Sequence, residues 1–580
     1  MLYSHDMTYG INNQLNSINM INSQIYKYYN TNSNTGSIGR GSLLLYLFIF
    51  IFSGCINESE TTNDVFDITS DDSKKTNDVL VRTSDPSWLI YINDFACAID
   101  QSDKTILFPI SAPSIDGFMG IVEYSNDLYE HVYINEIMVE NGDNVNFGNI
   151  IIGDSILVRF IVGDNIQMPT ETLIIATPEL VIGEFEEKNY IDYNLIFTDL
   201  PTVLIFTNED IVNEPKILSQ IIINDLVENK VYETFAGIEI RGKSSQAYPK
   251  KSYDLELWED KIGSDTNKEE LFGLRNDDDW HLDAMYIDLS KTRNILGMET
   301  WGSFARSSHL LLEEDALLYQ RGNIVELFLN NNYVGIYSMN EQIDRKQLDL
   351  KKNGGILYKS DAWYDENMFK GIGVEPDTSL FWSGYELKYP DEIDIEYWTP
   401  LYDFINLVAY SDDETFIASI ENVLDIQNAI DFFIFLNLIQ ANDNVGSNLY
   451  IFRYDEEYPL AFIPWDLDLT FGNKNSTWSV DDPDDRIITN KIFNRLYALD
   501  VNNYRNKVKL RWNEIYQDGI QEYIINKLTE NINNLIDSKA DNRDNKKWNF
   551  ETDYNERLEY IINWLNTRID FFNNYIDSKY

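Results

Sequence analysis

The chain has 580 residues, of which 44% are hydrophobic and 14% aromatic, and its formal net charge at pH 7 is −51. Its length exceeds what one hydrophobic core usually supports, so two or three domains are expected, and the apolar content excludes a wholly disordered chain. Because 96 acidic residues face only 45 basic ones, the surface repels phosphate backbones, and nucleic acid is not an expected partner.

The first 55 residues have the pattern of an export signal. Arg40 precedes a ten-residue apolar run, 43–52, which is too short to span a bilayer as a helix and is typical of a signal peptide. Ser53-Gly54 directly before Cys55 resembles the lipobox of bacterial lipoproteins. We therefore predict a leader over residues 1–55, lipidation of Cys55, and an exported protein anchored in the membrane at the cell surface. An uncleaved signal anchor is the alternative.

Two regions of different composition follow the leader. Residues 56–87 are rich in Ser, Thr, Asp and Asn, which predicts a flexible linker. Residues 88–186 alternate short apolar runs with turn residues, which predicts a small all-β, sandwich-like domain. Nothing in it carries recognisable chemistry, so a binding or spacer module is expected. Cys97, in the apolar sequence FACAI, is predicted to be a buried thiol.

A larger domain is predicted for residues 190–580. It opens near Tyr193 with NLIFTDLPTVLIFT, which predicts two buried strands, and a basic cluster follows. Arg241, Lys243, Lys250 and Lys251 lie within eleven residues of a chain that is short of bases. Between them, small polar residues predict a turn that joins two strands. Accessible backbone N–H groups flanked by lysines suit a phosphate, although neither a Walker A motif nor the kinase G-x-G-x-x-G is present. A hairpin with a basic surface tip explains the pattern equally well.

Helix and strand patterns alternate through the rest of this domain. Residues 290–306 predict a helix with a serine N-cap, and residues 324–344 predict a hairpin with an Asn-rich turn. The aromatic, irregular region 361–399 is a candidate lid or substrate surface. Amphipathic helices are expected over 399–441 and from about 490 to the end of the chain.

Two short strand patterns in this domain are each joined to carboxylates and amides. Asp443 and Asn448 form a D-x-x-x-x-N arrangement, and Asp466 and Asp468 lie in W-D-x-D before a Phe-Gly pair. Magnesium prefers hard oxygen ligands and often shares them with nucleotide phosphates. Protein kinases have a catalytic Asp with a metal-binding Asn five residues on, then a second metal-binding Asp near Phe-Gly. The pattern indicates a metal site, and a hairpin with Asp- and Asn-rich turns is the alternative.

Five stretches of the chain together resemble the CotH family of kinase-like proteins. In chain order they are RGKSSQAYPKKSYDLEL, LFGLRNDDDWHL with the following YIDLSKTRN, FLNNNYVGIYSMNEQIDR, NDNVGSNLYIF and PWDLDLTFG. The resemblance covers residues 193–580 and leaves out the β-rich region. It implies an α+β fold with an atypical protein-kinase-like domain. Such a domain binds ATP and Mg²⁺ and phosphorylates Ser or Thr of a protein substrate.

The resemblance implies catalytic and metal-binding roles by position. Asp443 corresponds to the catalytic-loop Asp, which orients or deprotonates the acceptor hydroxyl. Asn448 and Asp466 correspond to magnesium ligands. Asp468 is either a further metal ligand or a structural turn residue.

The resemblance also implies nucleotide-binding residues. Lys251 is the first choice for the contact with the α- and β-phosphates, and Lys250 is the second. Arg241 adds positive charge, and Glu341 matches a glutamate of the family whose role is not assigned. The chain has Lys243 where many relatives carry Asn.

Three functions are consistent with these observations. The first is a cell-surface protein kinase that transfers the γ-phosphate of ATP to Ser or Thr of a secreted or surface protein. The second is a catalytically weak or inactive kinase-fold adhesin or scaffold, and the third is a glycan-binding surface protein. The ordered Asp and Asn motifs favour the first, because the other two functions do not require them.

Overall fold

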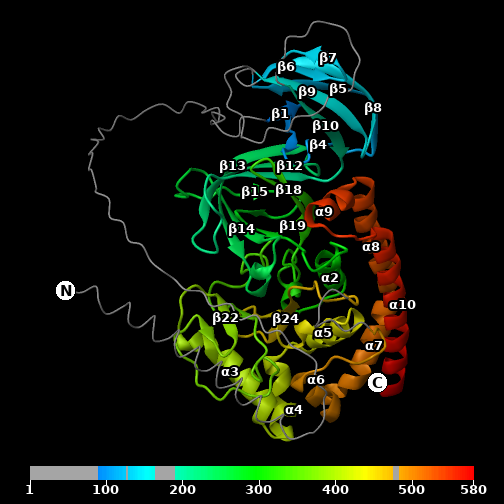
Figure 1. The fold of residues 1–580 in the computed structure, drawn as a ribbon. Coiled ribbons are helices and arrows are strands. Elements are labelled where there is room, and N and C mark those ends of the chain that lie inside the picture. Colours follow the sequence, from blue (N-terminus) through cyan, green and yellow to red (C-terminus); the bar gives the residue numbers. More distant parts are fainter. Residues whose placement is uncertain (1–88, 126–128, 163–189, 474–481) are drawn as a thin grey trace, which may run out of the picture. The chain divides into compact units, whose positions relative to one another are not determined.

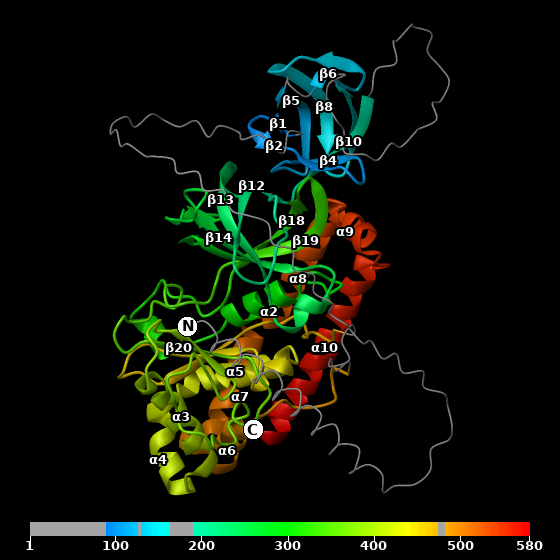
Figure 2. The ribbon, with the colours of Figure 1, turned by 60° about the vertical axis from the view of Figure 1, so that its left-hand side comes forward.

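The computed structural model describes residues 89–125, 129–162, 190–473 and 482–580 (Figures 1 and 2). The predicted leader with Cys55 and the linker 56–87 lie outside these residues. The described part combines sheets and helices, so the predicted α+β class is confirmed. Within it, no helix combines the length and the apolar character needed to cross a membrane.

The described residues 90–124, 129–162 and 190–198 form two sheets around one hydrophobic core. One sheet has the order β2-β1-β5-β8, and the other has the order β3-β4-β10-β9-β6-β7. Both contribute to the core, and the free thiol of Cys97 is buried in it, as predicted. The strands are β1 (Ile90–Ile92), β2 (Phe95–Ala96), β3 (Ala98–Asp100), β4 (Thr105–Pro109), β5 (Ser114–Tyr124), β6 (Tyr129–Ile134), β7 (Ile137–Val139), β8 (Asp143–Ile151), β9 (Ser155–Val162) and β10 (Tyr190–Thr198).

Strand β10 extends the β-rich region beyond its expected end at residue 186. It pairs in parallel with β4 and antiparallel with β9, and Leu195 and Phe197 lie in the two-sheet core. The sequence predicted the strand but assigned it to the larger domain. Its apolar pattern suits a buried strand of either domain, and only strand pairing decides between them.

The larger domain begins with a closed barrel of order β11-β12-β13-β14-β17-β19-β18. Its interior is filled by apolar side chains such as Ile221, Ile238 and Leu255, which are fully buried. Strands β18 and β19 form the predicted hairpin, and its turn residues Asn330 and Asn331 adopt positive φ angles, which asparagine tolerates. The barrel strands are β11 (Thr202–Phe206), β12 (Ile217–Asp225), β13 (Lys230–Arg241), β14 (Ser252–Trp258), β17 (Asp279–Asp283), β18 (Gly322–Leu329) and β19 (Asn332–Asn340), and the short pair is β15 (Glu269–Glu270) and β16 (Asn276–Asp277).

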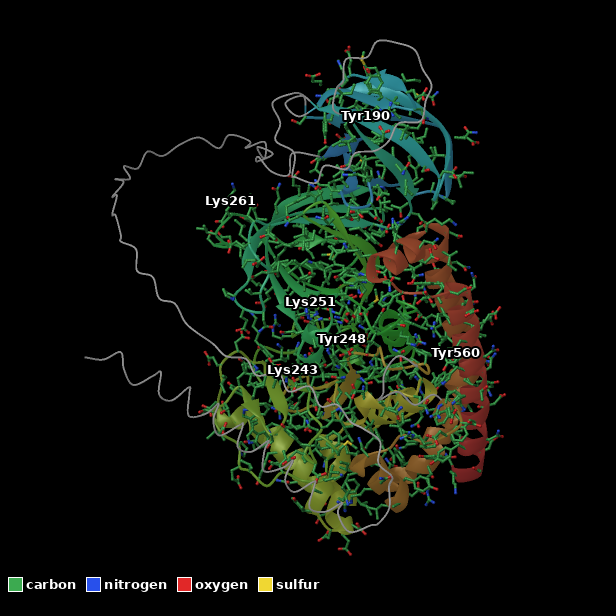
Figure 3. The ribbon with its side chains drawn as sticks, viewed as in Figure 1. Tyr190, Lys243, Tyr248, Lys251, Lys261 and Tyr560 are labelled. Atoms are coloured by element: carbon green, nitrogen blue, oxygen red, sulfur yellow. The ribbon has the colours of Figure 1, made fainter. Side chains whose placement is uncertain are left out.

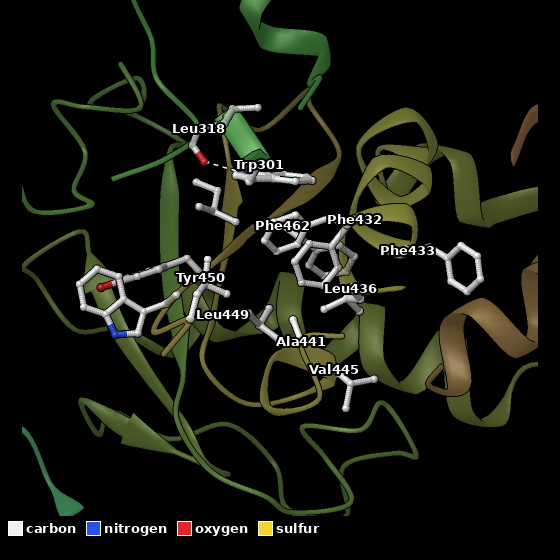
Figure 4. Packing of buried hydrophobic residues seen from close by; sticks show 14 of the residues in the cluster. Trp301, Leu318, Phe432, Phe433, Leu436, Ala441, Val445, Leu449, Tyr450 and Phe462 are labelled. Carbon is white, nitrogen blue, oxygen red and sulfur yellow. Dashed lines mark hydrogen bonds between the residues drawn. The ribbon is translucent and has the colours of Figure 1, made fainter. Parts of the chain in front are cut away.

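A five-stranded sheet of order β21-β22-β20-β23-β24 lies against apolar helices. Phe432 of α5 (Ile426–Leu438) packs against Phe462 of β24 and also contacts Trp301, whose indole N–H donates a hydrogen bond to the Leu318 carbonyl at 2.8 Å (Figure 4). Helix α8 packs beside α10 (Figures 1 and 2). The strands are β20 (Ile356–Ser360), β21 (Phe381–Trp382), β22 (Tyr385–Tyr389), β23 (Leu449–Arg453) and β24 (Leu460–Pro464).

The helices of the described residues cover the predicted helical regions. The α-helices are α2 (Arg293–Gly302), α3 (Ile395–Tyr410), α4 (Asp413–Val423), α5 (Ile426–Leu438), α6 (Lys491–Leu499), α7 (Tyr504–Gln517), α8 (Ile520–Asp537), α9 (Ala540–Trp548) and α10 (Tyr554–Lys579). The 3₁₀ helices are η1 (Ser244–Ala247), η2 (Ser308–Leu311), η3 (Asp443–Val445) and η4 (Val501–Asn503).

Helix α2 begins later than its sequence pattern predicts. The Asp288 carboxylate accepts hydrogen bonds from the backbone N–H groups of Ser290, Thr292 and Arg293 at 2.8–2.9 Å. It also accepts the Ser290 hydroxyl at 2.6 Å. The predicted N-cap role of Ser290 is therefore wrong, because its hydroxyl is bound to the aspartate that organises the start of the helix.

Candidate active site

The two Asp and Asn motifs meet at one end of the β23–β24 hairpin. Leu449 pairs with Pro464, so the residue before β23 and the residue after β24 are neighbours. The Trp465 N–H donates a hydrogen bond to the Asn448 carbonyl at 2.9 Å. Antiparallel pairing therefore places Asn448, before β23, and Asp466, after β24, at the same end of the hairpin.

Asp443 and Asn448 are in direct contact. The Asn448 side-chain amide donates a hydrogen bond to Oδ2 of Asp443 at 2.6 Å. The neighbouring Asn444 amide donates to the carbonyls of Asn448 at 2.8 Å and Trp465 at 2.6 Å, which fixes this loop on the hairpin. Burial raises the pKa of Asp443 above its ordinary value, although hydrogen bonds from Trp363 and Asn448 oppose this.

Two of the predicted metal ligands have unusual backbone conformations. Asn448 has a φ of 46° and Asp466 a φ of 56°, in the left-handed region. Asn and Asp enter this region more readily than most residues, but at some cost in free energy. Such strain is common at functional sites, where surrounding contacts hold a side chain in place.

Asp443, Asp466, Asp468 and Asp283 form a group of carboxylates in which the charges of Asp283 and Asp443 disfavour the ionisation of Asp466 and Asp468. The pKa of Asp466 is raised to about 6 by burial, then by the negative charges of Asp283 and Asp443. Burial, Asp466 and Asp283 raise the pKa of Asp468 well above its ordinary value. Asp466 is closely surrounded by protein yet keeps an exposed surface, so a ligand can reach it. This set of oxygen donors fits a divalent cation, which would relieve the repulsion.

Asp283 is the carboxylate of this group that sequence reasoning did not single out. It ends β17, and its Oδ2 accepts a hydrogen bond from the Asn294 amide of α2 at 3.1 Å. Oδ1 of Asn294 accepts the Leu467 N–H at 3.1 Å, so one asparagine joins the barrel to the W-D-x-D segment. Asp283 lies between LFGLRNDDDWHL and YIDLSKTRN, outside the stretches that resemble the family, and nothing in its spacing separates it from the neighbouring aspartates.

Lys251 closes the basic turn. Its ammonium donates hydrogen bonds to the carbonyls of Gln246 and Tyr248, both at 2.6 Å. Figure 3 labels Lys243 and Tyr248 in the turn of residues 242–248, and Lys251 just after it. Lys251 therefore stabilises the turn in this structure, and its contact with nucleotide stays a prediction.

Lys250 lies in the interior of the protein. It has no exposed side-chain surface, and its ammonium donates to the Ile336 carbonyl at 2.5 Å and to Asp544 of α9 at 3.0 Å. Burial lowers its pKa to about 7, although Asp544 opposes this change. This geometry does not support the predicted nucleotide contact, because Lys250 has no surface to offer a ligand.

Glu341 is also buried and paired. Its carboxylate accepts two hydrogen bonds from the Arg321 guanidinium, at 2.6 and 3.0 Å, and one from the Arg275 N–H at 2.8 Å. It is 1% exposed, so these partners enclose it. The geometry supports a role in holding two loops together and does not support the predicted contact with nucleotide.

The basic turn contacts the aromatic region 361–399. Nζ of Lys243 lies 2.6 Å from Oδ2 of Asp361. Trp363, two residues further on, is 56% exposed and hydrogen-bonds to Asp443. The predicted lid or substrate surface therefore borders the catalytic candidate.

Two cations lie over the ring of Trp465, next to Asp466. The Arg241 guanidinium carbon is 5.6 Å from the ring centroid, and Nζ of Lys359 is 5.3 Å from it. Arg241 ends β13 of the barrel, as the predicted position of the basic turn requires, whereas Lys359 belongs to β20. Sequence reasoning missed Lys359, because one lysine in a strand pattern carries no signal.

Asp277, Asp278 and Asp279 form another carboxylate group, with oxygens within 4.8 Å of one another. Arg275 lies 2.5 Å and Lys346 2.8 Å from Asp277, and Lys346 is 3.7 Å from Asp278. These cations already balance much of the negative charge. The group therefore fits a structural ion-pair cluster better than a metal site.

Comparison with known protein families matches residues 238–572, more than half of the chain, to the family described as CotH kinase protein. The chain belongs to the CotH kinase family. This membership confirms the resemblance seen in the sequence, and it makes the chain a kinase-like protein of a family that implies ATP use and typically a divalent metal. No curated protein matches the chain.

Proposed function

We propose that this CotH kinase family member transfers the γ-phosphate of ATP to Ser or Thr of a secreted or surface protein, with Mg²⁺ as the metal. The observation that carries the proposal is the contact of Asp443 with Asn448 beside the mutually repelling carboxylates of Asp466 and Asp468. Phosphoryl transfer depends mainly on positioning and on neutralising charge, and this site offers groups for both.

The side chains divide into two roles. Asn448, Asp466 and Asp468 would hold Mg²⁺, which supplies positive charge to the phosphate oxygens when bound. Asp443 would accept the proton of the substrate hydroxyl. Its raised pKa suits this task, because a base with a higher pKa holds a proton more strongly. The hydrogen bond from Asn448 holds Asp443 in one orientation.

Calorimetry of ATP binding with and without Mg²⁺ tests this function on the full-length protein. The wild type and Glu457→Ala are expected to bind ATP in a magnesium-dependent manner, and Asp466→Ala is expected to lose binding. Glu457 is a matched control, because it is an exposed acid at the opposite end of the same hairpin. Absence of binding to folded wild-type protein would overturn the proposal. Transfer of labelled phosphate to secreted proteins is the next measurement.

A kinase-fold scaffold without catalytic activity is the second candidate. It is favoured by the internal contacts of Lys250 and Lys251, which leave neither predicted lysine free for phosphate. A scaffold of this kind binds ATP weakly or not at all and transfers no phosphate. Phosphate transfer that depends on Asp443 would exclude it.

We also propose that the protein is exported and anchored to a membrane through lipid on Cys55. The support is the apolar run and small residues before that cysteine, which lie outside the described residues. Because Cys97 is buried in a core, lipid label on the folded protein reports on Cys55. Cys55→Ser is expected to lose the label and to leave the membrane fraction. Retained label or membrane association in this variant would contradict the lipoprotein proposal.

A further inference from the structure

Lys359 is a partly buried cation that forms no direct ion pair among the described residues, although Glu386 is its cross-strand neighbour in β22 and Asp361 also acts on its charge at longer range. Of the residues that the structure describes, no carboxylate lies within the ion-pair distance of 4.0 Å from its ammonium, and no hydrogen bond satisfies it. Its ammonium lies over the ring of Trp465, 5.3 Å from the centroid. Burial, and then the charge of Arg241, lower its pKa, and the charges of Glu386 and Asp361 oppose this only in part. A buried cation of this kind costs free energy unless an anion compensates it.

Arg241 brings a second positive charge to the same ring. Its guanidinium reaches Trp465 at 5.6 Å, and Nε lies only at the outer limit of ion-pair distance, 3.9 Å, from Asp254. Asp254 in turn lies 2.9 Å from Nε2 of His281, so its carboxylate is shared. Two cations from different sheets therefore face one aromatic ring, and each disfavours the charge of the other.

This arrangement is unexpected from the composition of the chain. Acidic residues outnumber basic ones by 96 to 45, so a lysine of this chain is expected to form an ion pair with a nearby carboxylate. The ring that carries the two cations is followed directly by Asp466, whose pKa both cations lower in part. A negatively charged ligand at this place would relieve the repulsion between Lys359 and Arg241, and it would lie next to the candidate metal ligands.

We propose that Lys359 and Arg241, which both lie at the ring of Trp465, form the anion subsite that binds the phosphate chain of the nucleotide. Lys359, from β20, then supplies the lysine contact that the sequence assigned to Lys251 or Lys250. The assignment of this subsite to a nucleotide rests on the proposed function. The subsite itself requires only a polyphosphate anion accompanied by a divalent cation.

Binding of tripolyphosphate and of ATP, each with Mg²⁺, tests the subsite on the full-length protein by calorimetry. Lys359→Met is expected to weaken both ligands by the same factor, about tenfold or more, because a hydrogen bond to a charged group contributes about 1.5–3 kcal/mol. Lys546→Met is the control, since Lys546 is a 67% exposed lysine of α9 that pairs with Asp103 at 2.8 Å. It is expected to bind as the wild type does.

Thermal unfolding separates a ligand contact from a structural role. Without ligand, Lys359→Met is expected to unfold at the wild-type temperature or above it, because it removes a partly buried positive charge that Arg241 disfavours. A clear decrease would assign Lys359 to the packing of Trp465 and overturn the proposal. If Lys359→Met does not fold, the same calorimetric measurement is made on Arg241→Gln. Tripolyphosphate affinity in Arg241→Gln equal to that of the wild type would overturn the proposed subsite.

The proposed function and the subsite can fail separately. Tripolyphosphate binding that depends on Lys359, without phosphate transfer from ATP, would support the subsite and contradict the kinase activity. Magnesium-dependent ATP binding that is equal in the wild type and Lys359→Met would contradict the subsite and leave the kinase function standing.

Discussion

Lys250 of the barrel and Asp544 of α9 form an ion pair of 3.0 Å, and neither side chain has any exposed surface. Lys291 approaches the other carboxylate oxygen at 3.6 Å, and the Ile336 N–H donates to the first oxygen at 3.0 Å. One aspartate near the C-terminus therefore organises two buried lysines and a barrel strand. This carboxylate joins α9 to the barrel beside two other contacts, the pair of Arg543 with Glu326 and the hydrogen bond from Trp548 to the Val334 carbonyl.

Asp544→Asn is expected to destabilise the protein. The variant leaves Lys250 and Lys291 without a carboxylate in a buried place, at a cost of about 3–5 kcal/mol in the free energy of unfolding. Urea denaturation measures it. Lys546→Met on the same helix is the control, because Lys546 is 67% exposed and its loss should change the free energy by less than about 0.5 kcal/mol. Equal stability of the two variants would refute the role of Asp544.

The pH dependence of stability is expected to report on Asp466. The pKa of Asp466 in the folded protein is about 6, above the ordinary value of 3.8. Between pH 3.8 and about 6, Asp466 therefore keeps a proton in the folded protein that it has lost in the unfolded chain. The contribution of Asp466 to the free energy of unfolding without metal therefore falls as the pH rises from about 4 to 6. Denaturation at several pH values, compared between wild type and Asp466→Asn, measures it. Identical pH profiles would contradict the raised pKa.

Bound Mg²⁺ is expected to offset the loss of stability that ionisation of Asp466 causes. Above pH 6 the ionised carboxylates repel one another, and Mg²⁺ should raise the unfolding temperature of the wild type. Asp466→Asn should be more stable than the wild type without metal at pH 7, and it should gain less from added Mg²⁺. A variant that gains as much as the wild type would place the metal elsewhere.

Asp443→Asn is expected to separate catalysis from binding. The amide oxygen can still accept the hydrogen bond from Asn448, so the loop should keep its structure and ATP should still bind. Phosphate transfer should decrease by about 10²- to 10⁴-fold, because the variant lacks the proton acceptor. The measurement compares single-turnover transfer with ATP affinity. Undiminished transfer would remove Asp443 from the mechanism.

Glu341→Gln is expected to affect stability and not nucleotide affinity. The variant weakens a buried pair with Arg321, and a cost of about 3 kcal/mol in the free energy of unfolding follows from the loss of one charged partner. Calorimetry at a temperature where the variant is folded should give the wild-type affinity for ATP with Mg²⁺. Reduced affinity with unchanged stability would restore the predicted role of Glu341 in nucleotide binding.

Patterns that depend on neighbouring residues were predicted well. The hairpin of β18 and β19 follows from alternating apolar residues and an Asn-rich turn, and buried α5 follows from its continuous apolar run. The start of α2 was missed, because Asp288 competes with the cap residue through contacts that no spacing rule contains. The domain assignment of β10 was missed because strand pairing joins distant parts of the chain.

The sequence by itself determined the α+β class, the family, and the motif that contains Asp443, Asn448, Asp466 and Asp468, since these depend on residue order and on short spacing. The tertiary structure alone decided which charges meet. It buried Lys250 against Asp544, enclosed Glu341 with Arg321, and brought Lys359 to Trp465. Burial and distance determine the free energy of a charge, and both depend on contacts between residues far apart in the chain.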